Sequence, residues 1–91
     1  MREKEADLNI LRGEINKIDD ELIKLIVMRQ ETAKLIGLAK KEQGLEVFNP
    51  AREQEVINRL LEKTPDEYKD AVKKLYGTIF EISKAVQEEK A

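Results

Sequence analysis

The sequence predicts an all-α fold in which three helices, long, short and long, form an intertwined homodimer. Apolar residues recur at steps of three and four over long stretches, which is the spacing of one face of a helix. Two proline-containing pairs, Asn49-Pro50 and Thr64-Pro65, are typical of helix starts and divide the chain into three parts. No segment favours a strand, and 91 residues suit one small domain, which we place at residues 1–91.

The first predicted helix begins near Ala6 or Asp7 and ends at Glu42 or Gln43, because Gly44 suits the position after a C-terminal cap. At 1.5 Å per residue this helix is roughly 54 Å long. A compact monomer of this size has a radius of gyration of about 12 Å, so the rod is too long for it. The exposed part would present a contiguous apolar stripe, and a dimer in which the helix crosses both halves is the simplest way to cover it.

Cations interrupt the apolar seam of this first helix. The seam has the heptad spacing of a coiled coil and comprises Leu8, Leu11, Ile15, Ile18, Leu22 and Leu25. The same count next reaches Arg29, Thr32 and Ile36, so an arginine stands where a leucine is expected. Lys40 follows Arg29 by three turns on nearly the same face. Because an unpaired buried cation is unfavourable, we expect an anionic group to meet these side chains.

The second predicted helix has Asn49 as its N-cap and Pro50 in its first position, and it ends near Lys63. Its apolar stripe comprises Val56, Ile57, Leu60 and Leu61. Arg52 and Glu53 lie four residues before the first two of these, so they stand at the head of the buried stripe.

A third predicted helix follows at once, because Thr64-Pro65-Asp66-Glu67 has the pattern of a capping box with proline in the first helical position. Its wide apolar face comprises Tyr68, Val72, Leu75, Ile79, Ile82 and Val86, flanked by Tyr76 and Phe80. The row formed by Tyr76 and Phe80 continues to Ser83 and Gln87, so this apolar row also becomes polar near one end.

The composition excludes several classes of function. The net charge of −2 gives no basic surface for nucleic acid, and no apolar run is long enough to span a membrane. Residues 1–5 lack the apolar region of a signal peptide, and cysteine is absent, so we expect a cytoplasmic protein. Because histidine is absent as well, most zinc sites and the Cys-His and Ser-His nucleophile pairs are excluded. We expect no metal and no cofactor.

Seven polar residues stand against the apolar pattern: Arg12, Arg29, Lys40, Arg52, Glu53, Ser83 and Gln87. Each alone has an ordinary explanation, such as a surface charge, a fraying helix end or, for Arg29, a buried polar residue that sets a coiled-coil register. Together they suit a small ligand with two anionic groups and a hydroxyl, because arginine matches a carboxylate bidentately. Arg12 and Arg29 are about 25 Å apart on a straight helix, so they must come from different chains to hold one ligand.

The chain resembles the all-helical (AroQ-class) chorismate mutases over nearly its whole length. The residues that carry the resemblance are Leu11-Arg12-Gly13-Glu14-Ile15, Ile18-Asp19, Arg29, Ala39-Lys40, Asn49-Pro50-Ala51-Arg52-Glu53 and Ser83-Lys84-Ala85-Val86-Gln87. Their order, spacing and type agree together, whereas any one of them alone would be a weak signal. The chain differs at Asn49, where relatives often carry aspartate; a role through the backbone amide would make that change harmless.

The resemblance implies a domain-swapped dimer with two sites, each of which takes one arginine from the partner, and the rearrangement of chorismate to prephenate in phenylalanine and tyrosine biosynthesis. It implies that Arg12 of the partner and Arg29 hold the two carboxylates of the substrate. The donors to the ether oxygen would be Lys40 and Gln87. Glu53 would accept from the ring hydroxyl, and the remaining polar shell would comprise Asn49, Arg52 and Ser83. A pericyclic step of this kind needs no nucleophile, metal or proton shuttle.

Three other interpretations remain open. An isochorismate-pyruvate lyase of the same fold is built from much the same residues, and product analysis with each substrate separates the two. A regulatory helical module that senses a diacid would bind the ligand without turnover. A plain coiled-coil scaffold is the third, and the polar residues of the second and third helices argue against it.

Overall fold

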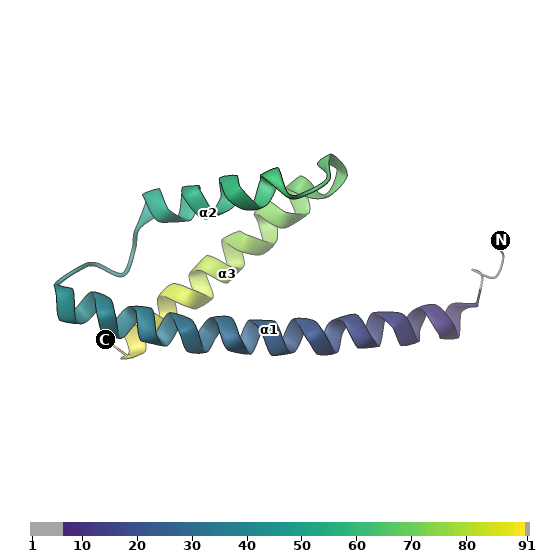
Figure 1. Cartoon of the computed structure of the whole chain (residues 1–91), viewed down its shortest axis with the longest axis horizontal. Helices are drawn as coiled ribbons and strands as arrows, with labels where there is room; N and C mark the ends of the chain where they lie inside the picture. The colour runs from purple at the N-terminus through teal and green to yellow at the C-terminus, as the bar shows by residue number, and fades with distance from the viewer. Residues whose placement is uncertain (1–6, 91) are drawn as a thin grey trace. The chain divides into compact units, whose positions relative to one another are not determined.

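The computed structural model describes residues 7–90 and is all-helical over them (Figure 1). Its elements are α1 (Leu8–Gln43), α2 (Pro50–Glu62), a 3₁₀ turn η2 (Asp66–Tyr68) and α3 (Lys69–Lys90). These bounds confirm the predicted order of a long, a short and a long helix. No strand occurs in residues 7–90. None of the described helices combines the length and apolar character needed to cross a membrane. The chain divides into two compact units, Met1–Glu31 and Thr32–Ala91, and the division falls within α1.

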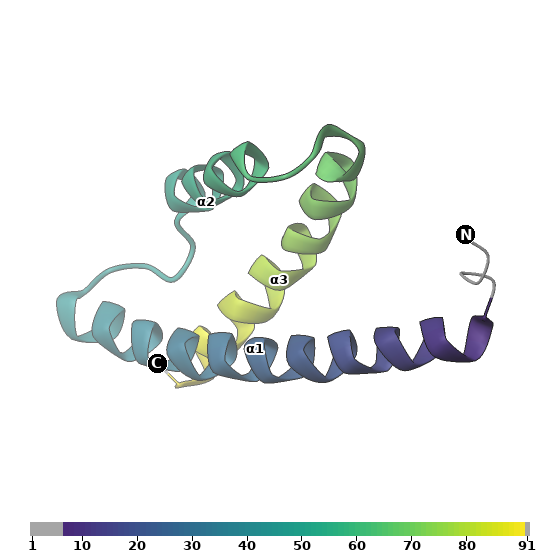
Figure 2. The ribbon, with the colours of Figure 1, turned by 45° about the vertical axis from the view of Figure 1, so that its right-hand side comes forward.

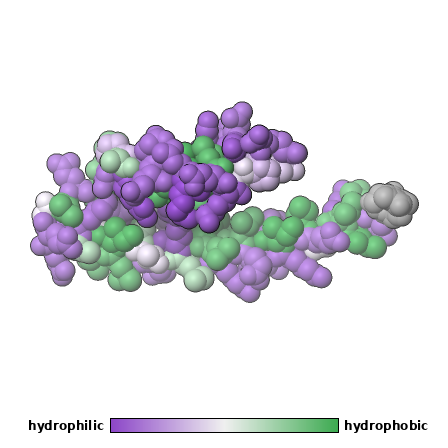
Figure 3. Space-filling view, turned by 45° about the horizontal axis from the view of Figure 1, so that its top comes forward, coloured by the Kyte–Doolittle hydropathy of each residue, from purple (hydrophilic) through white to green (hydrophobic). Residues whose placement is uncertain are grey.

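The first unit is the N-terminal part of α1, and Asp7 caps it. The Asp7 side chain accepts hydrogen bonds from the backbone N–H groups of Asn9 (3.0 Å) and Ile10 (3.2 Å), which satisfies two of the free donors of the first turn. Ala6, the other predicted start, lies outside the described residues. The seam residues Leu8, Leu11, Ile15, Ile18, Leu22 and Leu25 are all exposed, by 44 to 58%. Apolar side chains are therefore visible along this part of the helix in the space-filling view (Figure 3).

The C-terminal end of α1 belongs to the second unit and stops at Gly44, as predicted. Gly44 has φ +70°, in the left-handed region that glycine reaches without steric cost. Its N–H donates to the carbonyl of Lys41 (3.2 Å), and the next N–H, of Leu45, donates to the carbonyl of Lys40 (2.8 Å). This pair of bonds is the Schellman motif, which satisfies the last carbonyls of a helix and turns the chain sharply.

The start of α2 agrees with the sequence, whereas the start of the third helix differs. Asn49 Oδ1 accepts from the backbone N–H of Arg52 at 3.1 Å, so Asn49 is the N-cap of α2. The predicted capping box at Thr64 is wrong. The Thr64 hydroxyl donates to the carbonyl of Leu60 (2.7 Å) and so bonds to the end of α2. The N-cap of η2 is Pro65, which has no side-chain cap bond, and a 3₁₀ turn precedes α3.

Within the second unit, α2 and α3 contact each other across the turn that joins them (Figures 1 and 2). Val56 is the buried apolar side chain of α2, and Tyr76 and Phe80 of α3 stack edge to face with ring centroids 5.7 Å apart. The other buried positions of this unit are Ala33 and Gly37 on α1 and Ser83 and Gln87 on α3. Two of these four are polar, although buried polar groups are costly without partners. The buried surface between the ends of α1 and α3 is therefore unlike an ordinary apolar core.

Candidate active site

The centre of the candidate site is a contact between Lys40, near the end of α1, and Gln87, near the end of α3. The Lys40 ammonium donates to Gln87 Oε1 at 3.0 Å and to the carbonyl oxygen of Val47 at 2.6 Å. Gln87 is buried and Lys40 is half-buried. An ammonium has three donors, so one N–H of Lys40 remains after these two bonds. Because Gln87 accepts through Oε1, its NH₂ group is left as a donor.

Gly37 sets the distance between the two helices at this contact. A Cβ atom at position 37 would lie 2.9 Å from Gln87 Cα, 3.0 Å from its carbonyl oxygen and 3.1 Å from its Cβ. Two of these atoms are backbone and cannot move aside by a change of rotamer. Gly37 precedes Lys40 by one turn of α1, so the close approach and the hydrogen bond lie on one helix face.

A second polar cluster joins α2, α3 and the segment before α2. The Lys84 ammonium lies 3.2 Å from Glu53 Oε2, and both side chains are less than one third exposed, at 29 and 27%. The same ammonium lies over the ring of Phe48, 4.5 Å from its centroid, in a cation–π arrangement. One cation therefore contacts an acidic side chain of α2 and an aromatic ring of the preceding segment.

The neighbouring cation, Arg52, faces away from this cluster. Its guanidinium pairs with Glu55 at 2.8 Å, and the two side chains are 62 and 70% exposed. A pair this exposed contributes little to stability, because water screens it. The single chain therefore does not bring Arg52 to the Lys40–Gln87 contact, and its role in a site stays a prediction.

The remaining predicted residues lie on different elements. Ser83 is buried, 6% exposed, one turn before Gln87 on α3. Asn49 serves as the cap of α2, so its side-chain oxygen is engaged by the backbone.

Arg12 is exposed and Arg29 half-buried, and both belong to the unit Met1–Glu31. Within the unit Thr32–Ala91 the structure thus gathers Lys40, Glu53, Ser83 and Gln87 near the ends of three helices.

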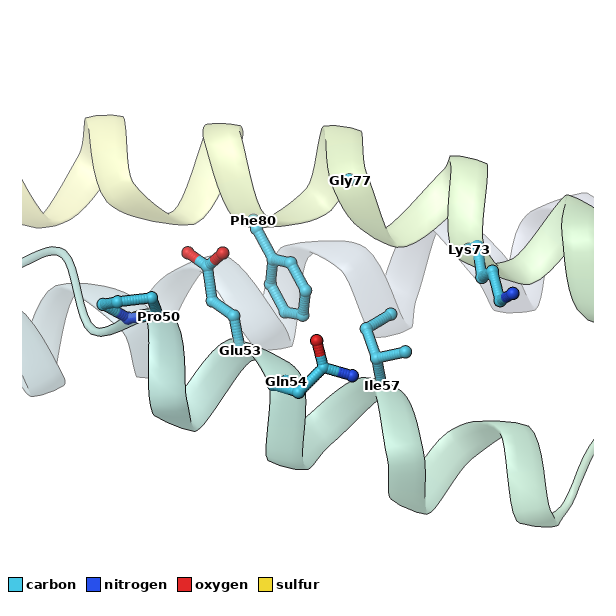
Figure 4. A pocket seen from close by; sticks show the side chains of 7 residues that line it. All are labelled: Pro50, Glu53, Gln54, Ile57, Lys73, Gly77 and Phe80. Carbon is cyan, nitrogen blue, oxygen red and sulfur yellow. The ribbon is translucent and has the colours of Figure 1, made fainter.

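A cavity of about 360 Å³ opens between α2 and α3 (Figure 4). Its lining residues are Pro50, Glu53, Gln54, Ile57, Lys73, Gly77 and Phe80. Glu53 and Ile57 of α2 and Phe80 of α3 point into the space between the two helices, and Glu53 extends toward α3. Glu53 is the one predicted site residue among those that line it.

Comparison with known proteins decides the family. The protein family described as "Chorismate mutase type II" matches residues 11–88 of this chain, which is most of its length. The chain belongs to this family. The resemblance stated from the sequence is therefore confirmed, as is the all-helical fold class that it implies.

The relatives of this chain differ in how much of their own length it covers. A "Chorismate mutase" of Methanocaldococcus jannaschii is 30% identical over 98% of this chain and 89% of the relative. An "Intracellular chorismate mutase" of Mycobacterium tuberculosis is 37% identical over 66% of this chain. A "Bifunctional chorismate mutase/prephenate dehydratase" of Aquifex aeolicus is 34% identical over 81% of it. The chain spans 57% of the mycobacterial relative and 18% of the bifunctional one.

A solved structure has the same fold. A conserved hypothetical protein from Pyrococcus furiosus superposes with a TM-score of 0.73 and 38% sequence identity, over 90% of this chain and 96% of that one.

Two residues of the candidate site, Gly37 and Lys84, were not predicted from the sequence. A signal for Gly37 was present, because Ala33 and Gly37 are small residues one turn apart in a helix of large ones, and such pairs let another helix approach closely. Lys84 belongs to a segment that carries the resemblance, but nothing marked it as a site residue, since one lysine among many on a charged helix normally indicates a solvated face.

The arrangement has a limited chemistry. It offers a neighbouring amide and ammonium, a half-buried carboxylate and a buried hydroxyl. Within the described residues there is no group of three His, Cys, Asp or Glu side chains that could hold a metal. Such a set can bind an anionic ligand and stabilise charge that develops on an oxygen atom.

Proposed function

We propose that the chain catalyses the rearrangement of chorismate to prephenate, with Lys40 and Gln87 as the groups that stabilise the transition state. The observation that carries this proposal is the Lys40–Gln87 contact. It fixes the amide of Gln87 with its oxygen toward the ammonium, and so leaves one N–H of Lys40 and the NH₂ of Gln87 as neighbouring donors. Two such donors suit a single oxygen that becomes more negative as the reaction proceeds.

The reaction is a Claisen shift within one molecule. The ether C–O bond breaks while a new C–C bond forms, and no atom enters or leaves. Electron density accumulates on the ether oxygen as its bond lengthens, so donors aimed at this atom bind the transition state more tightly than the substrate. The second contribution is to hold the substrate in its compact, reactive conformer, which removes an entropic part of the barrier.

The substrate has two carboxylates and a ring hydroxyl, and the other polar residues are proposed to hold these groups. Arg29 and Arg12 of the partner subunit bind the carboxylates, because a guanidinium forms two parallel bonds to a carboxylate. The Glu53 carboxylate accepts a hydrogen bond from the ring hydroxyl. The polar shell is completed by Ser83 and Arg52, together with the cap residue Asn49.

A homodimer is part of the proposal, because Arg12 and Arg29 lie about 25 Å apart on one helix. The exposed seam of the first unit supports it, since Leu22 and Leu25 are 48 and 58% exposed and a soluble protein covers so long a stripe. In the intertwined arrangement, a second copy covers the seam and receives Arg12 in its site.

The direct test follows chorismate and prephenate by NMR with the purified protein and with a protein-free blank that measures the uncatalysed reaction. We expect chorismate to disappear and prephenate to appear in equal amounts. A parallel reaction with isochorismate tests the lyase, which would release pyruvate. Tight binding of chorismate without turnover of either substrate would contradict an enzyme and favour a diacid-sensing module.

The assembly is tested by sedimentation and by unfolding at several protein concentrations. A dimer has about twice the chain mass of 10.5 kDa, and its unfolding midpoint rises with concentration because association stabilises the folded state. A monomer whose midpoint is independent of concentration would contradict the shared site.

A further inference from the structure

The ion pair between Glu53 and Lys84 joins two helices and lies largely out of solvent. Its side chains are 27 and 29% exposed, whereas those of the pair Arg52–Glu55, between residues of one helix, are 62 and 70% exposed. A half-buried carboxylate is held in place by its partner more strictly than an exposed one, because fewer waters compete for it. Glu53 therefore depends on Lys84 for its orientation more than a surface carboxylate would.

The Lys84 ammonium meets the Glu53 carboxylate at Oε2. Lys84 approaches Glu53 Oε2 at 3.2 Å, and a carboxylate has two oxygens with separate lone pairs. The neighbouring cation does not compete, since the Arg52 guanidinium lies on Glu55. With the ammonium at Oε2, the oxygen Oε1 remains as an acceptor for a ligand.

Lys84 is itself held from a second direction. The Phe48 ring lies 4.5 Å from the Lys84 ammonium, and it belongs to the segment that also contains Val47, the acceptor of Lys40. A flexible four-carbon side chain has many rotamers, and the two contacts together restrict the position of its charge.

We propose that Lys84 is a positioning residue of the active site: it fixes the carboxylate of Glu53 through Oε2, so that Oε1 accepts the hydrogen bond of the substrate's ring hydroxyl. This inference rests on the proposed function. Lys84 itself contacts no reacting atom. Its loss leaves the hydroxyl of the substrate without a directed acceptor, while the donors at the ether oxygen remain in place.

The experiment compares Lys84→Met with the parent protein on two substrates, chorismate and its analogue in which the ring hydroxyl is replaced by hydrogen. Methionine keeps the apolar length of the side chain and removes the charge. We expect kcat/KM for chorismate to fall about tenfold, the loss of roughly one well-placed charged hydrogen bond. For the deoxy analogue the change should stay below about twofold, because that substrate makes no use of Glu53.

Four further variants separate positioning from structure. Lys84→Arg keeps a cation beside Glu53 and should restore most of the chorismate activity. The double variant Lys84→Met/Glu53→Gln should be no slower than Glu53→Gln alone, because both changes remove one interaction. The matched control is Lys69→Met, another lysine of α3, whose 3.0 Å ion pair is with the exposed Asp66 near the start of the same helix. This change should leave kcat/KM unaltered for both substrates.

The proposal would be overturned if Lys84→Met lowered kcat/KM equally for the two substrates. It would also be overturned if the losses of kcat/KM from the two single changes added up in the double variant. A second measurement does not depend on turnover: unfolding midpoints of the two single variants and the double variant should be non-additive if Lys84 and Glu53 interact. Additive midpoints overturn the inference even with an active enzyme. An inactive parent protein overturns the proposed function, while the unfolding cycle still reports on the ion pair, so the two failures are distinguishable.

Discussion

Gly37→Ala tests whether the approach of α3 to α1 sets the geometry of the donors. The added Cβ would lie 2.9 Å from Gln87 Cα, and two carbon atoms in ordinary contact are about 3.5–4.0 Å apart. The backbone of α3 must therefore retreat by roughly 0.6–1 Å. The Lys40–Gln87 hydrogen bond of 3.0 Å would then lengthen to about 3.6 Å or more, beyond the range of a hydrogen bond.

The effects of this change on stability and on rate are of different size. Overpacking costs about 1–3 kcal/mol, and alanine in place of glycine within a helix recovers about 1 kcal/mol. The net loss of stability is therefore about 0–2 kcal/mol. A displacement of nearly 1 Å at the donors is expected to lower kcat/KM by roughly a hundredfold.

The assay measures kcat/KM for chorismate and, on the same preparation, the free energy of unfolding in urea. Gly13→Ala is the matched control for helix propensity, because a Cβ at that position meets no atom within 4 Å. It should raise the free energy of unfolding by up to about 1 kcal/mol. If folded Gly37→Ala keeps kcat/KM within about twofold of the parent, the close approach does not position the donors and the reasoning is wrong.

Three other predictions concern the donors and the shared site. Lys40→Ala should lower kcat/KM by about 10²–10³, as loss of an oxyanion donor does, and a fall below about threefold in a folded variant would contradict its role. Gln87→Glu donates only when the new carboxyl is protonated, so its rate should rise toward acid, and a pH profile equal to the parent's would remove Gln87 from the site. Arg12→Ala and Arg29→Ala should each be nearly inactive, yet an equal mixture refolded together should regain roughly a quarter of parental activity, since half the dimers are mixed and have one intact site. A refolded mixture that stays at the single-variant level, with chain exchange verified, would refute the shared site.

The helix boundaries that the sequence predicts correctly depend on local chemistry. Asn49-Pro50 and Gly44 act through bonds to residues within one turn, so their effect is readable from a few letters. Thr64 is not the cap because the 3₁₀ turn begins one residue later than predicted, with Pro65 in the cap position. The Thr64 hydroxyl donates to the carbonyl of Leu60, one turn back at the end of α2.

The candidate site likewise has residues that could be predicted from the sequence and residues that could not. Lys40 and Gln87 were predictable because each places a polar group on an apolar row, and burial of such a group demands a partner. Lys84 was not, because the pattern around it is that of a solvated helix face and its partner lies on another helix. The distance between α1 and α3 at Gly37 depends on packing between segments 50 residues apart. The spacing of apolar residues along one helix carries no information about such a distance.

The end of α1 has a consequence for how this chain can vary. The backbone carbonyl of Lys40 closes the Schellman turn by accepting from Leu45, and its side chain reaches forward to the carbonyl of Val47. One residue therefore anchors both sides of the connection between α1 and α2. Surface connections normally tolerate insertions, because lengthening them costs little entropy. Here an inserted residue after Gly44 would carry the Val47 carbonyl away from the ammonium and leave it with the bond to Gln87 alone. Under the proposed function, the length of this short loop would therefore affect the rate.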